Sequence, residues 1–215
     1  MRVLIVTSVQ AEADAVGSID HSKVIVGGVG RTNAAAATTE AIIRDGAFDM
    51  VLNTGVAGAL PGGGLSIGEV VVASRCVYAE EGLLTPSGFT DIAALGLALG
   101  DFSGNAVPVD ERALTRLSLL FRCGPIATVA TCSGTDAAAQ EVVRRTAAIA
   151  EAMEGAAVVH AARRLGVPGV ELRAVSNTTG DRLRQAWNLP KGLTALGEAV
   201  PRAVSTLRAG SATRR

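Results

Sequence analysis

The chain has 215 residues, of which 48% are hydrophobic and 19% are charged, a composition that excludes intrinsic disorder and allows a sizeable buried core. Its 20 basic and 20 acidic side chains cancel, so no charge footprint points to nucleic acid or a membrane surface as a partner. No stretch reaches the roughly 18 unbroken apolar residues that span a bilayer.

Apolar runs of strand length alternate with segments whose apolar residues recur at helical spacing. In chain order, we predict strands at residues 2–6 and 23–26, a helix at 32–43, strands at 48–53 and 69–74, a helix at 108–120, a strand at 126–131, a helix at 155–165, a strand at 170–176 and a helix at 193–207. This alternation predicts an α/β fold, a single-domain three-layer α/β/α sandwich with a central mixed, twisted sheet over residues 1–207.

Three segments are predicted to be loops. Residues 81–104 are rich in glycine and lack periodicity, and long loops in a compact domain are often functional. Residues 27–30 (Gly-Gly-Val-Gly) lack the spacing of a Walker A or dinucleotide motif, so a tight turn is the simpler interpretation. Residues 208–215 are predicted to form a disordered tail.

The cysteines and histidines offer no metal site. Cys76, Cys123 and Cys132 lack metal-ligand spacing, and His21 and His160 have no companion at a useful spacing. We therefore expect neither a metal nor an organic cofactor. An odd number of cysteines suits a reducing compartment, so a cytoplasmic location is expected.

Polar groups stand in small, apolar surroundings at four places. Glu12 follows the first predicted strand, where ligands bind in open α/β sheets; a solvated acid in the first turn of a helix is the alternative. Glu154 stands between Met153 and a Gly-Ala-Ala-Val-Val run, and a buried glutamate needs a partner or a ligand. Segments 53–58 and 176–180 each follow an apolar strand, where small residues let a flat ligand approach the backbone.

Taken in this order, these places resemble the nucleoside phosphorylase and nucleosidase superfamily over nearly the whole chain. The motifs are Met153-Glu154-Gly155-Ala156-Ala157 and Gly55-Val56-Ala57-Gly58. Ser176-Asn177, Gly180-Asp181-Arg182 and Trp187 make the chain most similar to the methylthioadenosine/S-adenosylhomocysteine nucleosidases and, closer still, to the futalosine hydrolases of the menaquinone pathway. The resemblance implies a nucleoside phosphorylase-like fold, cleavage of a purine–sugar bond, and a homodimer or larger homo-oligomer.

The resemblance also implies a role for each matching residue. Glu12 falls on the acid that positions and activates water, and Glu154 on the acid that binds the ribose hydroxyls, with Met153 lining the sugar. Asn177 falls on the residue facing the imidazole edge of the purine, and Trp187 on an aromatic ring beside the ligand. The expected pocket wall comprises Val56, Ala57, Gly58, Ser133, Gly134, Thr135 and Ser176.

The chemistry of the reaction supports these roles independently. Breaking an N-glycosidic bond builds positive charge on the sugar and negative charge on the departing base. A carboxylate near the sugar orients water and favours an oxocarbenium-like state, and a donor at the base stabilises the leaving group. Glu12, Glu154 and Asn177 provide this minimal catalytic set.

Asn177 departs from the adenine-cleaving nucleosidases, which place Asp there. An amide cannot act as a general acid at neutral pH, but it can donate to a ring nitrogen and a neighbouring carbonyl oxygen, which a carboxylate would repel. The exchange favours a 6-oxopurine such as hypoxanthine, the base of futalosine. The alternative is a loop asparagine that caps its own turn.

A second departure separates hydrolase from phosphorylase. Where phosphorylases of this superfamily hold phosphate with Arg and Ser, this chain has Asn53 and Val56, and its first loop offers Glu12, which suits water and repels phosphate. Arg31 and Arg75 are expected on the surface. Hydrolysis of futalosine is therefore predicted; the alternatives are a methylthioadenosine/S-adenosylhomocysteine-type nucleosidase, a purine nucleoside phosphorylase and an inactive nucleoside-binding protein.

A third departure concerns the cover of the base. Nucleosidases carry Phe-Ile shortly after a Ser-Gly-Asp segment, whereas this chain has Ala137-Ala138 after Ser133-Gly134-Thr135-Asp136. Stacking on the base is therefore expected to be lost or supplied elsewhere, and Asp136 becomes a doubtful ligand.

Overall fold

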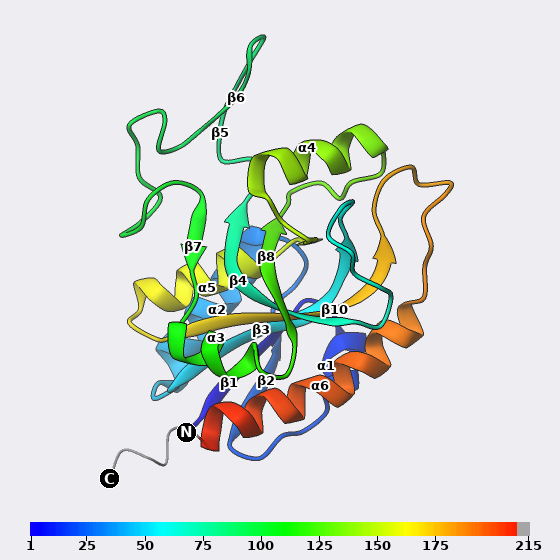
Figure 1. Ribbon diagram of the computed structural model, residues 1–215. Helices are drawn as coiled ribbons and strands as arrows, with labels where there is room; N and C mark the ends of the chain where they lie inside the picture. Colours follow the sequence, from blue (N-terminus) through cyan, green and yellow to red (C-terminus); the bar gives the residue numbers. More distant parts are fainter. Residues whose placement is uncertain (210–215) are drawn as a thin grey trace.

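The computed structural model describes residues 1–209 as an α/β domain, drawn in Figure 1. Its strands are β1 (Val3–Thr7), β2 (Ser22–Val26), β3 (Met50–Ala59), β4 (Val70–Tyr78), β5 (Gly82–Thr85), β6 (Gly88–Asp91), β7 (Ala106–Pro108), β8 (Arg122–Thr128), β9 (Ala150–Ala152) and β10 (Gly169–Thr178). Its helices are α1 (Gln10–Val16), α2 (Arg31–Asp45), α3 (Glu111–Leu117), α4 (Asp136–Thr146), α5 (Gly155–Arg164) and α6 (Leu189–Ala209).

The central sheet is mixed and partly closed on itself. Its order is β10-β4-β8-β9-β3-β1-β2, and β10 also pairs with β3. Strands β1, β2, β3 and β10 are parallel, whereas β10–β4 and β3–β9 are antiparallel. The predicted single-domain α/β fold with a mixed sheet is confirmed.

Helices cover both faces of this sheet. In β1, Val3 and Ile5 belong to the cluster that includes Leu196 of α6, whereas Leu4 and Val6 pack in a second cluster. That second cluster contains residues of α2 and α5. Every residue of β1 is buried, as expected of a parallel strand between two helical layers.

One edge of β3 is left open in its middle, and this gap positions the site. Strand β1 pairs with β3 only as far as Asn53, and β9 joins the same strand from Gly58 onward. Since β10 pairs along the whole other edge, residues 54–57 keep one edge free. A side chain from outside the sheet can therefore reach the backbone there.

The longest strands extend beyond the predicted ones. The prediction that β3 ends at Asn53 is wrong, because residues 54–59 continue as strand through pairing with β10. Likewise β10 continues to Thr178, so Asn177 lies in a strand and not in a turn. Small and polar residues suggested turns here, but cross-strand pairing overrides this weak local preference.

Other differences lie at the periphery. Sequence patterns did not reveal α1, α4 or β9, and the segment predicted as loops at 81–104 contains the β5–β6 hairpin, which projects from the body in Figure 1. Helix α6 continues to Ala209, two residues into the predicted tail; residues 210–215 lie outside the described part. None of the helices within residues 1–209 is long and apolar enough to cross a membrane.

Candidate active site

A cavity of about 430 Å³ opens beside the free edge of β3. It gathers most of the predicted site residues: Glu12, Val56, Ala57, Gly58, Ser133, Gly134, Met153, Glu154, Ser176, Asn177 and Trp187. Thr135 does not line it. Its hydroxyl instead accepts a hydrogen bond from the backbone N–H of Ala138 and caps the N-terminus of α4, so the structure contradicts its placement in the pocket wall.

The Glu12 side chain occupies the gap in β3. Glu12 lies in the first turn of α1, as the alternative of a solvated helical acid predicts. The residue is nevertheless only 4% exposed, so it is not solvated. Oε1 accepts from the backbone N–H of Val56 at 2.9 Å, and Oε2 accepts from those of Ser8 at 2.8 Å and Val9 at 3.3 Å. Three fixed donors hold the carboxylate, while the cavity beside it is left open.

Gly55 makes this position of Glu12 sterically possible. A Cβ atom at residue 55 would lie 2.4 Å from Glu12 Oε1 and 2.8 Å from Arg173 Nη1. Any side chain there would push the carboxylate and the guanidinium away from the cavity. The glycine of the Gly-Val-Ala-Gly motif is therefore needed for close approach.

Arg173 lies at the centre of the buried charges, although it was not predicted as a site residue. It is 1% exposed and donates to Glu171 Oε1 at 2.8 Å, Asn53 Oδ1 at 2.5 Å and Glu154 Oε2 at 3.2 Å. Burial opposes its charge, but the carboxylates of Glu171, Glu154 and Glu12 outweigh this effect and raise the pKa of Arg173. It is a permanent cation beside Glu12 and Glu154.

Glu154 links this charge to the glycine-rich turn. Its Oε1 accepts from the backbone N–H of Gly30 at 3.0 Å, and its Oε2 accepts from Arg173 and, at 3.3 Å, from the N–H of Met153. The turn at 27–30 thus contacts a predicted site residue, and Val29 lines the cavity. Glu154 and Met153 line the same cavity.

A β-bulge aims Asn177 into the cavity. The register between β10 and β3 shifts between Val175 and Asn177, so that both Ser176 and Asn177 reach the cavity. Asn177 Oδ1 accepts from the Ser176 hydroxyl at 2.8 Å, and Nδ2 donates to the carbonyl of Thr178 at 2.9 Å. One amide hydrogen and one carbonyl lone pair are left for a ligand.

The loop between β10 and α6 forms the mouth of the cavity. Trp187 is 52% exposed, and the guanidinium of Arg182 stacks over its ring at 4.5 Å. Both side chains donate to the same acceptor, Gln185 Oε1, at 2.9 Å. The mouth therefore presents an aromatic face and a cation together.

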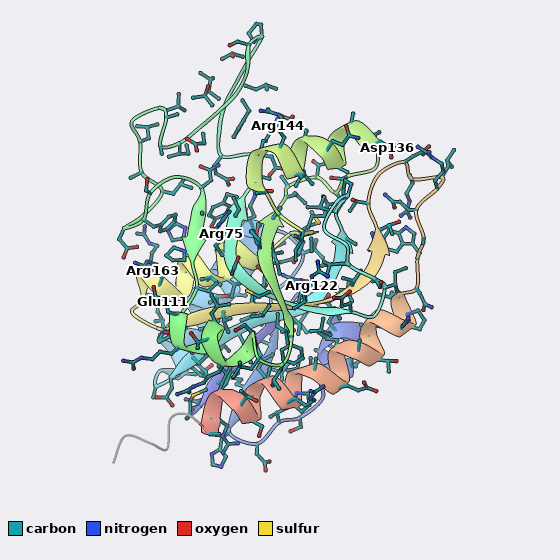
Figure 2. All side chains as sticks on the ribbon, in the orientation of Figure 1. Arg75, Glu111, Arg122, Asp136, Arg144 and Arg163 are labelled. Carbon is teal, nitrogen blue, oxygen red and sulfur yellow. The ribbon has the colours of Figure 1, made fainter. Side chains whose placement is uncertain are left out.

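Asp136 faces away from the cavity. It pairs with Arg184 and accepts from the N–H of Asp181, and Figure 2 shows it at the start of α4, beside the loop that follows β10. Neither Asp136 nor Ala137-Ala138 lines the cavity. That Asp136 is not a ligand for the substrate stays a prediction.

The phosphate-binding positions of a phosphorylase are occupied otherwise. Asn53 is fully buried, accepts from Arg173 and donates to the carbonyl of Val6. Arg31 pairs with Glu81 and Glu80, and Arg75 is exposed. Within residues 1–209, no three His, Cys, Asp or Glu side chains gather in a way that could hold a metal ion.

The chain is similar to known proteins over most of its length. A model of the phosphorylase superfamily matches residues 16–207. The futalosine hydrolase of Acidothermus cellulolyticus is 41% identical over 91% of this chain and 87% of its own, and that of Streptomyces coelicolor is 33% identical over 93% and 94%. A variant of the Helicobacter pylori nucleosidase with 5'-methylthioadenosine in its active site superposes with a TM-score of 0.77, at 20% identity, over 95% of this chain and 98% of that one.

Proposed function

The chain belongs to the phosphorylase superfamily and, within it, to the futalosine hydrolases, and on this premise we propose that it hydrolyses futalosine in the cytoplasm, releasing hypoxanthine for the menaquinone pathway. One observation carries the proposal. The carboxylate of Glu12 is held by three backbone donors at the edge of the cavity, beside the Arg173–Glu154 pair. This arrangement favours water as the nucleophile.

Glu12 is the proposed base for that water. A carboxylate offers about four acceptor sites, and three of those on Glu12 accept backbone N–H groups. The fourth can orient a water molecule toward C1 of the sugar and accept its proton as the C–O bond forms. The electron pair of the broken C–N bond leaves with the base, which takes up a proton from solvent.

Glu154 and Arg173 are proposed to act on the sugar. Glu154 would accept hydrogen bonds from the ribose hydroxyls, and its negative charge favours the developing oxocarbenium character. Arg173 fixes the orientation of that carboxylate through the 3.2 Å contact. An added phosphate would meet the carboxylates of Glu12 and Glu154 around a guanidinium that already makes four hydrogen bonds, which supports hydrolysis over phosphorolysis.

Asn177 is proposed to bind the imidazole edge of a 6-oxopurine. Its unused amide hydrogen can donate to a ring nitrogen as negative charge develops there, and removal of one such donor typically costs about a hundredfold or more in rate. An amide supplies this without a proton to transfer. Unlike a carboxylate, an amide also does not repel the neighbouring carbonyl oxygen of a 6-oxopurine, which favours substrates with such a base.

Arg182 and Trp187 fit the carboxylated aromatic substituent of futalosine. Arg182 lines the cavity and forms no ion pair with a carboxylate of residues 1–209. We expect Arg182→Ala to raise the KM for futalosine about tenfold, because the loss of one solvent-accessible charge-assisted hydrogen bond weakens binding by about that factor. The KM for inosine should change little. Arg184→Ala is the matched control, since Arg184 lies on the same loop but pairs with Asp136 and Asp181. Equal effects on both substrates would contradict a role in substituent binding.

We also propose a homodimer or larger homo-oligomer. The β5–β6 hairpin projects from the body (Figure 1) and exposes Leu83 by 50% and Leu84 by 70%. Apolar side chains exposed together favour burial against a second chain. Sedimentation velocity should give at least twice the mass of one chain, and Leu84→Ser should shift the equilibrium toward monomer; a wild-type monomer at micromolar concentration would contradict this assembly.

A comparison of substrates tests the proposed function. Purified protein is incubated with futalosine, inosine and methylthioadenosine without phosphate, and free base is followed by chromatography. We expect rapid release of hypoxanthine from futalosine. Rapid release from methylthioadenosine alone would favour the adenine-cleaving nucleosidase, and a nucleoside recovered bound but uncleaved would favour an inactive binding protein.

A further inference from the structure

A third carboxylate in the cavity has no role in the mechanism above. Glu151 of β9 is 4% exposed and lines the cavity. Its Oε1 accepts from the backbone N–H of Ser133 at 2.7 Å, and its Oε2 accepts from the Ser133 hydroxyl at 2.6 Å. No cationic side chain of residues 1–209 forms an ion pair with it. A buried carboxylate without a cation is costly unless further donors reach it.

Glu151 stands in one row with Asn177. Gly58 of β3 pairs with Glu151 of β9 on one side and with Asn177 of β10 on the other. Residues directly opposite one another point to the same face of a sheet. Consistently, a Cβ atom on Gly58 would lie 3.1 Å from Nδ2 of Asn177 and 3.6 Å from Cγ of Glu151, with the methyl group of Thr179 nearer still at 2.8 Å.

The missing side chain of Gly58 leaves a slot between these two groups. Neighbouring strands are about 4.8 Å apart, so the backbones of β9 and β10 flank the slot at about twice that spacing. Ala57 and Gly58 line the cavity here with no bulky side chain. A planar base entering the slot would have a carboxylate at one side and an amide at the other.

We propose that Glu151 selects the base by accepting a hydrogen bond from N1–H of a 6-oxopurine, while Asn177 binds the opposite, imidazole side. This inference rests on the proposed function and assigns a specificity-determining residue to its site. A 6-oxopurine carries a hydrogen on N1, which an ionised carboxylate accepts. A 6-aminopurine carries a lone pair there, which the carboxylate repels.

Each oxygen of Glu151 can still accept one further bond, because Ser133 supplies only one donor to each. Burial raises the pKa of Glu151, and a donor from the base would favour the ionised form. A site that hydrogen-bonds a polar group of its substrate strongly rejects analogues without that group, because the polar groups of the site are then left unpaired. The geometry therefore gives Glu151 more discrimination than an apolar wall could.

Glu151→Gln tests this assignment. The N–H of Ser133 can only donate, so it fixes the amide oxygen toward itself and turns the amide nitrogen toward the hydroxyl. We expect the preference for hypoxanthine over adenine, measured as the ratio of their Kd values by calorimetry, to fall about a hundredfold. Glu80→Gln is the control, because Glu80 acts on Glu151 only by its charge and does not line the cavity; its ratio should be that of the wild type.

A purely structural role for Glu151 predicts a different pattern. If the carboxylate only anchors Ser133, then Glu151→Gln and Ser133→Ala should weaken both bases equally, and an unchanged ratio in Glu151→Gln overturns the proposal. If Glu151→Gln does not fold, the binding of two ligands to the wild type tests the proposal instead. Hypoxanthine binding at least tenfold tighter than 1-methylhypoxanthine supports the proposal, and equal binding overturns it. Hydrolysis of futalosine by the wild type tests the proposed function separately.

Discussion

Glu12→Gln is expected to slow the hydrolysis of futalosine about a thousandfold while changing its Kd by no more than a few fold. General-base catalysis contributes about 10²–10⁴ in rate, and an amide cannot take the proton of the attacking water. The amide oxygen can replace Oε2 as the acceptor for Ser8 and Val9, so two of the three backbone contacts are kept and the local fold should survive. Single-turnover kinetics at saturating enzyme, with the Kd obtained from the concentration dependence, separate the two effects.

Glu154→Gln provides the contrast for this prediction. It removes charge from a group proposed to bind the sugar, so both the Kd and the rate should suffer. The same conservative exchange at two carboxylates in one cavity therefore gives two different kinetic patterns. Unchanged turnover in Glu12→Gln would remove Glu12 from the role of base.

Arg173→Met is expected to lower the free energy of unfolding by about 3–5 kcal/mol, the usual cost of removing one partner from a buried charge cluster. Glu171 is fully buried against Arg173, and its remaining oxygen finds no partner within residues 1–209. Burial already raises the pKa of Glu171, so without the guanidinium the residue must become neutral or be hydrated. Urea denaturation monitored by circular dichroism measures the loss.

Two further variants separate the effect of charge on stability from the effect of side-chain volume. In the double variant Glu171→Gln, Arg173→Met, the unpaired carboxylate is absent, and part of the lost stability should return. Arg75→Met serves as control, because Arg75 is exposed and its replacement should change stability by less than about 0.5 kcal/mol. If the double variant is as unstable as the sum of its single variants, the cluster does not act through charge.

The fold class could be predicted because the elements that define it are strongly patterned. The apolar strand β1 and the alanine-rich helices α2 and α5 alternate clearly, and their order allows few arrangements. Glu154 also stood out in sequence, as a carboxylate within a run of small apolar residues. Its burial and its partners agree with that reasoning.

Tertiary pairing decides what the sequence left open. Residues 54–58 were placed beyond the end of a strand because they are small, yet β10 pairs with all of them. Arg173 and Glu171 were missed although opposite charges two residues apart in an apolar strand share one face, a signal that should have drawn attention. Glu151 was not predicted as a site residue, because the donors that hold its carboxylate belong to Ser133, which is 18 residues away along the chain.

Water as the nucleophile is the central claim, and an isotope experiment tests it directly. Hydrolysis of futalosine is run in water enriched in oxygen-18, with and without phosphate, and the sugar product is analysed by mass spectrometry immediately after separation. We predict one oxygen-18 atom at C1 of the sugar and the same rate in both buffers. A reaction that requires phosphate and yields a sugar phosphate would contradict the assignment of Glu12 and place the chain among the phosphorylases in activity.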